Sequence, residues 1–141
     1  MLLLSVSILL VCSPRTVIKP FTTDQCSGGP EGPKDNPGVW CDCCLEHDRA
    51  YWQGGTRVQR RQADRALKQC VREHGYKGQS GVMHAAVRIF GSPFLPFPWR
   101  WGYGWRYFHA YHELTSEEAD SARTIFSREE SRHNYETGCS E

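Results

Sequence analysis

The stretch Cys41-Asp-Cys-Cys-Leu-Glu-His-Asp-Arg-Ala-Tyr51 decides how this chain is expected to fold, because it sets a histidine, a carboxylate and a phenol beside three cysteines. On a helix, Cys44, His47, Asp48 and Tyr51 lie at positions i, i+3, i+4 and i+7, which is one face. An imidazole beside a carboxylate on one stripe is what metal-assisted hydrolysis requires. The base takes a proton from water, and the carboxylate holds a cation that polarises a carbonyl.

The residues before this helix are expected to form a loop. Residues 24–38 contain four glycines and three prolines, which forbid a regular element and let backbone carbonyls turn towards one point. Hard cations such as calcium favour such oxygen ligands, although the loop taken alone favours a plain surface loop. Asn36 and Pro37 resemble an N-cap followed by proline in the first turn. The first helix is therefore expected over about 37–52, with a stop at Gly54 and Gly55.

A second helix is expected after the glycines. Thr56-Arg-Val-Gln59 reads as a capping box that opens it, and it should end near His74 and Gly75. Asp64 lies at the edge of its apolar stripe, and a carboxylate in that position needs a partner. The stripe itself consists of Ala63, Leu67, Cys70 and Val71.

The short connection between the two helices predicts an antiparallel hairpin. His47 lies about five residues before the turn and Asp64 about eight after it, so at a rise of roughly 1.5 Å per residue the two are nearly level. Cys43 and Cys70 are similarly matched further from the turn, which allows a bridge between them. Asp64 can then accept a hydrogen bond from one imidazole nitrogen and leave the other free as a base.

Together these residues resemble the secreted phospholipase A2 family. That family carries a Cys-Cys pair followed by His-Asp-x-x-Tyr, with a glycine-rich calcium loop before it and a helix bearing an aspartate after it. Here Cys43-Cys-Leu-Glu-His-Asp-Arg-Ala-Tyr51 matches the pattern through the tyrosine. The resemblance implies that His47 is the general base and Asp48 the side-chain calcium ligand. It also implies that Asp64 orients the histidine and that the Tyr51 phenol binds to Asp64.

The cysteines extend the resemblance, which implies the disulfides Cys26–Cys44 and Cys43–Cys70. A further bridge of animal members would use the positions of Ala50 and Ala63, so both of its cysteines are absent together. The interval from His47 to Asp64 leaves no room for the β-wing of animal members, so the chain is more similar to the compact prokaryotic and viral branches. The partners of Cys12, Cys41 and Cys139 stay open, with Cys41–Cys139 as one option.

The resemblance covers residues 24–75 and implies an all-α, disulfide-linked fold. An antiparallel two-helix core would carry the active site, with the Gly/Pro-rich calcium loop before it and extra helices after it. Calcium (Ca2+) would be held by Asp48 and by backbone carbonyls of Ser27 and Gly29, although the loop lacks the glycine spacing of animal enzymes. The implied activity is calcium-dependent hydrolysis of the sn-2 ester of glycerophospholipids, by a monomer with a phospholipid membrane surface as its substrate.

Composition sets the wider bounds. A chain of 141 residues is expected to form one domain, and its net charge of +1 argues against nucleic acid as a partner. Seven cysteines indicate an oxidising compartment. The apolar run at residues 2–11 suits a signal peptide and is too short to span a bilayer, so we expect export, with residues 1–20 as a signal peptide or N-terminal membrane segment. Residues 21–91 are then the catalytic core, and residues 92–141 an aromatic-rich segment with a C-terminal helix.

The aromatic segment (residues 93–108) has two interpretations of equal standing. Its Trp, Tyr and Arg residues suit a lipid headgroup boundary, and its prolines and glycines suit an irregular strap packed over the helices. After it, Thr115-Ser-Glu-Glu118 resembles a capping box that opens a helix through about Arg128. His109, His112 and His133 show no partner pattern.

Two other classes of function remain open. Cys41, Cys43, Cys44 and His47 could form a zinc-bound structural module, although three cysteines within four residues suit tetrahedral ligation poorly. A non-catalytic lipid- or protein-binding domain of the same fold is the other alternative, because folds outlive their chemistry.

Overall fold

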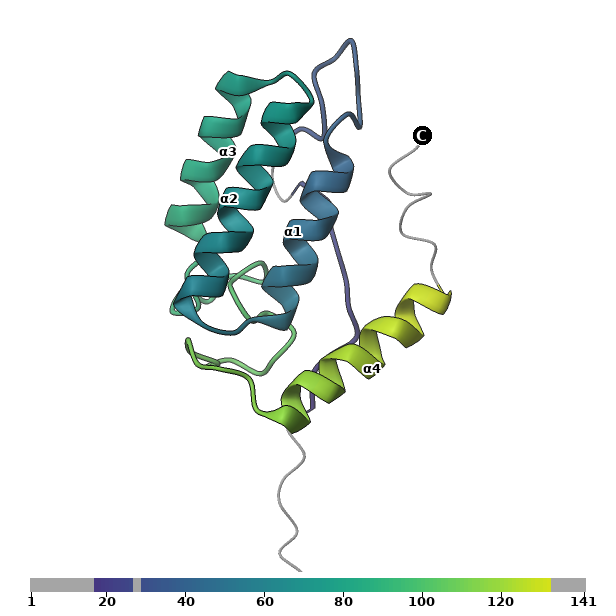
Figure 1. Ribbon diagram of the computed structural model, residues 1–141, viewed down its shortest axis with the longest axis vertical. Coiled ribbons are helices and arrows are strands. Elements are labelled where there is room, and N and C mark those ends of the chain that lie inside the picture. The colour runs from purple at the N-terminus through teal and green to yellow at the C-terminus, as the bar shows by residue number, and fades with distance from the viewer. Residues whose placement is uncertain (1–16, 27–28, 133–141) are drawn as a thin grey trace, which may run out of the picture.

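The computed structural model describes residues 17–26 and 29–132, and within these ranges the chain forms four helices and no strand. The helices are α1 (Cys41–Gln53), α2 (Arg57–Glu73), α3 (Lys77–Phe90) and α4 (Ser116–Arg132). α2 packs between α1 and α3, and α4 lies apart from these three and runs at an angle to them (Figure 1). The expected all-α class is therefore confirmed.

α1 begins later than the sequence predicted. Gly38 has a φ of 78°, in the left-handed region, so a right-handed helix cannot run through it. Trp40 is the N-cap instead of Asn36, and it makes no side-chain capping bond. Its indole Nε1 donates to the carbonyl of Pro30 at 2.8 Å. The turns before α1 thus tie the helix to the preceding loop.

The two predicted capping boxes are both present. The Thr56 hydroxyl accepts from the Gln59 amide at 3.2 Å, and the Gln59 side chain accepts from the Thr56 amide at 2.7 Å. Thr115 and Glu118 make the same pair of bonds at the start of α4, at 3.2 and 2.9 Å. α4 continues beyond the expected Arg128 to Arg132.

Two disulfides among the described residues close the first core, as the resemblance implied. Cys43 bonds to Cys70 with an S–S distance of 2.01 Å and joins α1 to α2, and Cys26 bonds to Cys44 at 2.06 Å and joins the loop to α1. Cys41 is also disulfide-bonded, but its suggested partner Cys139 lies outside the described residues. The buried side chains of this core are Cys26, Trp40, Cys43, Cys44, Leu67 and Val71.

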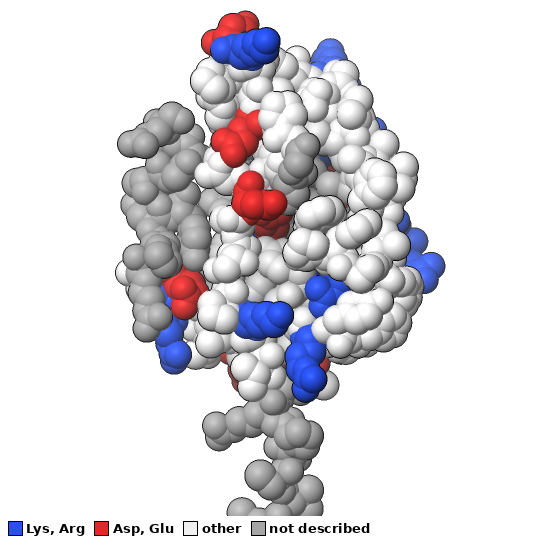
Figure 2. Space-filling model, turned by 180° about the vertical axis from the view of Figure 1, so that it is seen from behind, with Lys and Arg blue, Asp and Glu red and all other residues white. Residues whose placement is uncertain are grey.

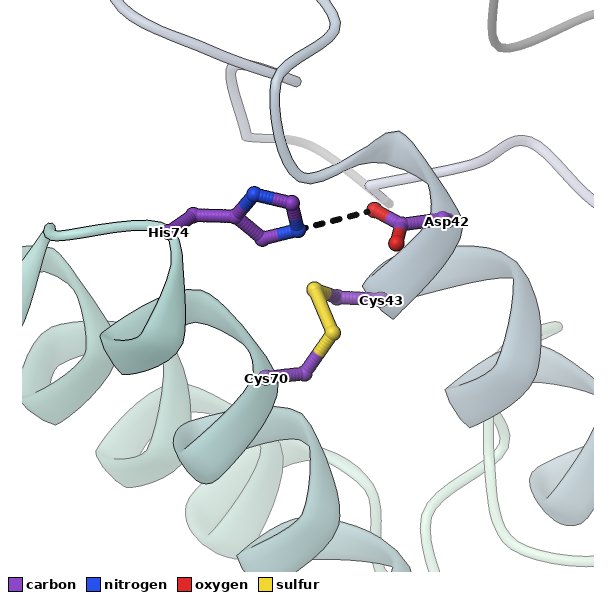
Figure 3. Close-up of side chains that lie close together, drawn as sticks. All are labelled: Asp42, Cys43, Cys70 and His74. Atoms are coloured by element: carbon purple, nitrogen blue, oxygen red, sulfur yellow. Dashed lines mark ion pairs between the residues drawn. A yellow bond between two sulfur atoms is a disulfide. The ribbon is translucent and has the colours of Figure 1, made fainter.

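An ion pair lies beside the disulfide that joins α1 to α2. His74, the C-cap of α2, has its Nε2 atom 3.4 Å from a carboxylate oxygen of Asp42 in the first turn of α1 (Figure 3). Both side chains are partly exposed, so the pair contributes little to the free energy of unfolding. The covalent bond holds the two helices together at this end.

The second core joins the start of the described chain to the aromatic segment and α4. Its buried side chains are Ile18, Phe21, Trp52, Trp105 and Ala122. Lys19 also bonds through its backbone to Gly104 and to the indole of Trp52. Residues 17–20 therefore belong to the packed fold, although the sequence grouped them with the N-terminal segment. The expected signal peptide itself and Cys12 lie outside the described residues. In the described part of the chain, no helix has the length and apolar character needed to cross a membrane.

The aromatic segment packs over the end of α1 through two of its tryptophans. Trp101 and Trp105 are 2% and 1% exposed, and their indoles donate to the carbonyls of Gly55 and Gln53 at 2.9 and 2.7 Å. Trp99 is 41% exposed. A β-carbon added at Gly104 would come within 2.6 Å of the Trp52 ring, so only glycine fits there. The strap interpretation thus holds for Trp101 and Trp105.

Charged side chains of both signs are scattered over the face shown in Figure 2. Uncharged residues cover most of that face. This mixture agrees with the net charge of +1.

Single tryptophan substitutions test the strap. Trp101→Ala should lower the free energy of unfolding by about 3–5 kcal/mol, because it leaves a cavity and an unpaired carbonyl at Gly55. Trp99→Ala is the matched control and should cost about 1 kcal/mol or less, because its side chain is exposed. Urea denaturation of the oxidised protein measures both. Equal losses from the two variants would contradict the assignment.

Candidate active site

His47 and Asp64 meet in the interior between α1 and α2. The Nε2 atom of His47 is 3.0 Å from Oδ1 of Asp64. Asp64 is fully buried and His47 is 8% exposed. The predicted hydrogen bond between the level positions of the two helices is therefore present, and it leaves the Nδ1 atom of His47 as the second nitrogen of the ring.

Asp64 has further donors on its two oxygens. The Tyr51 hydroxyl donates to Oδ1 at 2.7 Å, and Nη1 of Arg88 donates to Oδ2 at 2.6 Å. Burial alone would raise the pKa of Asp64, but the hydrogen bonds from His47, Tyr51 and Arg88 outweigh it and hold that pKa below its ordinary value. Asp64 is therefore a carboxylate at neutral pH and fixes the orientation of the imidazole.

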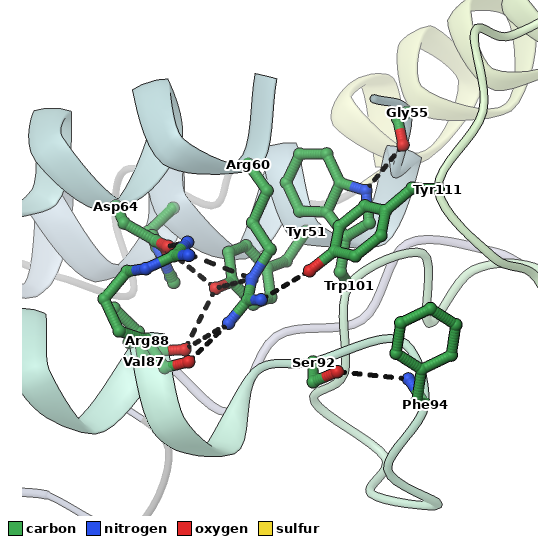
Figure 4. A network of polar contacts seen from close by, with 11 residues as sticks. Tyr51, Gly55, Arg60, Asp64, Val87, Arg88, Ser92, Phe94, Trp101 and Tyr111 are labelled. Atoms are coloured by element: carbon green, nitrogen blue, oxygen red, sulfur yellow. Dashed lines mark hydrogen bonds and ion pairs between the residues drawn. The ribbon is translucent and has the colours of Figure 1, made fainter. Parts of the chain in front are cut away.

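Arg60 lies close to Tyr51 and Asp64 and connects them to α3 (Figure 4). It is 3% exposed and lies one helical turn before Asp64 on α2. Its Nε atom donates to the Tyr51 hydroxyl at 3.0 Å, so Tyr51 relays a hydrogen bond from Arg60 to Asp64. The remaining guanidinium bonds go to the carbonyls of Val87 and Arg88, at 2.8 and 2.9 Å, and to the Tyr111 hydroxyl.

The end of α3 fits tightly against Tyr51. A β-carbon added at Gly91 would come within 2.5 Å of the phenol oxygen. Burial, followed by the neighbouring Asp64 charge, raises the pKa of Tyr51, so the phenol stays protonated and acts as a donor. This packing holds the Tyr51 hydroxyl where it can reach Asp64.

A cavity of about 370 Å³ opens in front of His47. His47, Asp48 and Tyr51 form part of its wall, together with loop residues and one face of α3. Its apolar lining comes mainly from Leu67, Val82, Met83, Ala86, Val87, Phe90 and Trp99. Phe90 and Trp99 are largely exposed, at 52% and 41%. The polar site therefore adjoins an apolar cavity with aromatic side chains near solvent.

Asp48 follows His47 in the sequence and lies in the same cavity wall. It is 8% exposed, and the Thr23 hydroxyl donates to its Oδ2 atom at 2.6 Å. Burial raises the pKa of Asp48 to about 7, with a further rise from the nearby Asp24 carboxylate and a partial offset from Thr23. A buried carboxylate next to a second acid is an environment that a bound cation would stabilise.

The loop before α1 is partly described. The Gly29 amide donates to the Cys26 carbonyl at 2.8 Å, and Gly29 lines the cavity together with Asp48. Ser27, the other expected carbonyl ligand, lies outside the described residues. The groups of Asp48 and of the backbone at Gly29 that could bind a cation are oxygen atoms, which are the ligands that calcium prefers.

The disulfides count against the zinc module considered from the sequence. Cys41, Cys43 and Cys44 are all disulfide-bonded, and a disulfide sulfur is not the thiolate that zinc requires. A second group of possible metal ligands lies close together in Figure 3 and consists of Asp42, Cys43, Cys70 and His74. Its two cysteines form a disulfide with each other, so they offer no thiolate to zinc either. His47 in turn points its Nε2 atom at Asp64.

Three contributors to the site were missed by sequence reasoning. Arg60 carried a signal, because it lies four residues before Asp64 on the same helical face. Arg88 and Thr23 carried no such signal, because α3 and the coil before the loop reach the site only through the tertiary fold.

Compared with known proteins, the chain matches no family model, no curated protein and no solved structure.

The raised pKa of Asp48 predicts a pH dependence of stability in the presence of EDTA. Its folded pKa of about 7 exceeds the ordinary value of 3.8 for this side chain, so between these limits the folded state binds more protons than the unfolded state. This contribution therefore destabilises the protein as pH rises from about 4 to 7, by a few kcal/mol at most, since a tenfold change in proton affinity is about 1.4 kcal/mol.

Comparison with Asp48→Asn isolates this contribution, because the amide does not titrate. Urea denaturation across the same pH range should show the variant gaining stability relative to the parent protein as pH rises. A difference that does not change with pH would contradict the assignment.

Proposed function

We propose that this chain is a calcium-dependent hydrolase of the secreted phospholipase A2 type, which cleaves the sn-2 ester of glycerophospholipids. One observation carries the proposal. His47 lies in the wall of an apolar cavity beside the buried carboxylate Asp48, with its Nε2 atom bonded to Asp64 and its Nδ1 atom left for a base. The segment from Cys43 through Tyr51 resembles the signature of that family, and this resemblance also supports the proposal.

His47 is the proposed general base. Because Asp64 is ionised, its Oδ1 atom accepts a hydrogen bond from Nε2–H of His47, and the imidazole keeps a lone pair on Nδ1. His47 takes a proton at Nδ1 from a water molecule, and the resulting hydroxide attacks the ester carbonyl. The same nitrogen then returns the proton to the glycerol oxygen as it leaves. Asp64, Tyr51 and Arg60 hold the ring in place during both transfers.

Asp48 and the carbonyls of the loop are the proposed calcium ligands, with Gly29 and Ser27 as the residues that the resemblance names. When bound, calcium polarises the ester carbonyl and stabilises the oxyanion. The Thr23 hydroxyl fixes one oxygen of Asp48 at 2.6 Å and so limits how that carboxylate can turn. The disulfide from Cys26 to Cys44 holds the loop against the helix that carries Asp48.

The cavity supports an acyl chain as the bound part of the substrate. Its lining from α3 is apolar, and a volume of about 370 Å³ is within the usual range of small-molecule sites. The exposed rings of Phe90 and Trp99 favour a membrane surface as the source of that substrate. Because disulfides persist in oxidising compartments, we also propose that the protein is exported.

Replacement of the base tests the mechanism. His47→Gln should lower phospholipid hydrolysis by at least roughly a hundredfold, because it removes the proton acceptor and keeps a polar side chain of similar length. Calcium binding should persist, since Asp48 and the loop are unchanged. The matched control is His74→Gln, which changes an exposed histidine on α2 and should retain full activity. The assay is release of fatty acid from mixed vesicles with calcium, with products identified by position.

Near-normal turnover in His47→Gln would contradict the mechanism. A parent protein that binds vesicles and calcium but hydrolyses no phospholipid would favour the alternative of a non-catalytic lipid-binding domain.

Replacement of the carboxylate tests the metal. Asp48→Asn should abolish calcium binding, because a divalent cation among neutral carbonyls needs a formally negative ligand. Asp42→Asn removes an exposed acid from the same helix and should leave calcium binding intact. Isothermal titration with calcium measures both variants, and EDTA should silence the parent enzyme until calcium is restored. Unchanged calcium affinity in Asp48→Asn would remove Asp48 from the site.

A further inference from the structure

Two histidines and a glutamate converge where the chain leaves the aromatic segment and enters α4. The Nε2 atom of His109 is 3.3 Å from Oε1 of Glu118, and the Nε2 atom of His112 is 3.2 Å from Oε2 of the same carboxylate. The two imidazole rings lie 4.3 Å apart between centroids. One ligand atom from each residue falls within 4.8 Å of the others. These three residues play no part in the proposed active site.

Each of the three side chains is held in place by a separate contact. The Glu118 carboxylate accepts from the Thr115 amide at 2.9 Å as part of the capping box. The Nδ1 atom of His112 lies 3.1 Å from the Ala110 carbonyl, so a proton there leaves Nε2 unprotonated. A histidine that binds a metal is usually oriented by such a bond on its other nitrogen. His109 stacks on the Trp105 ring at 5.0 Å.

The distances are compatible with metal ligation. Ligand bonds of about 2.0–2.1 Å in a tetrahedral zinc site place neighbouring ligand atoms roughly 3.3 Å apart. Each histidine nitrogen lies at about this distance from one oxygen of the Glu118 carboxylate, His109 from Oε1 and His112 from Oε2. A shift of the side chains by about an ångström or less would bring all three around one ion, because their ligand atoms already lie within 4.8 Å of one another.

The donor set also suits zinc. Two imidazoles and one carboxylate are ligands that zinc takes in proteins.

We propose that His109, His112 and Glu118 form a binding site for zinc. The ion would join the chain after the aromatic segment to the first turn of α4, and so hold α4 against the second core. His112 has 38% of its side chain exposed, which gives the ion a path from solvent, whereas the Glu118 side chain is 10% exposed. With three protein ligands, the fourth tetrahedral position falls to a water molecule.

Zinc titration of the full, disulfide-bonded chain tests the site after chelator treatment. Isothermal titration should show zinc binding by the parent protein. His112→Gln and Glu118→Gln should each weaken it at least tenfold, since even the loss of a supporting residue around a ligand has that effect. Glu118→Gln keeps a side-chain oxygen for the capping bond, so it should still fold. Bound Co²⁺ should show the intense visible absorption of tetrahedral coordination in the parent protein and lose it in both variants.

Two controls separate this site from other histidines. His74→Gln and His47→Gln should both keep the parent affinity for zinc, and the second also keeps this proposal distinct from the proposed active site. Thermal unfolding without metal reports whether each variant folds, and added zinc should raise the midpoint of the parent protein but not that of Glu118→Gln. Absence of zinc binding in the parent protein, or parent-like affinity in both His112→Gln and Glu118→Gln, would overturn the proposal. Loss of zinc binding in His47→Gln would also overturn it.

Discussion

The buried carboxylate of Asp64 is the constraint on which the rest of the structure depends. An ion with no exposed surface is tolerated only if its oxygens are fully paired, and Asp64 takes donors from α1 and α3 as well as an ion pair within α2. His47 and Tyr51 supply two of these bonds and Arg88 supplies the third. The requirement therefore fixes the relative positions of three helices, and the orientation of His47 follows from it.

Covalent bonds complement this polar centre. The Cys43–Cys70 disulfide joins α1 and α2 at the end away from their connection, and the Cys26–Cys44 disulfide fixes the loop in front of α1. A small core gains much of its stability from such links, because they restrict the unfolded chain. With both ends of the hairpin held, the cavity beside His47 keeps its shape without a large apolar interior around it.

The aromatic segment has different structural roles along its length. Trp101 and Trp105 are buried and bond to the carbonyls of Gly55 and Gln53, and Trp105 belongs to the second core. Trp99 lines the cavity and stays partly exposed to solvent. Just beyond the segment, His109 stacks on Trp105 and faces Glu118. One stretch of chain thus links the proposed active site, the second core and the proposed zinc site.

Local patterns in the sequence were enough to determine the helical face that carries His47 and Asp48, the capping boxes at Thr56 and Thr115, and the level placement of His47 and Asp64. Such features depend on residues within a few positions, or on a hairpin with a short turn. The start of α1 was missed because the positive φ of Gly38 depends on how the loop packs. Arg88, Thr23 and the group of His109, His112 and Glu118 were decided by tertiary structure alone. Their partners come from separate elements, and neither helical period nor spacing says which distant side chains will meet.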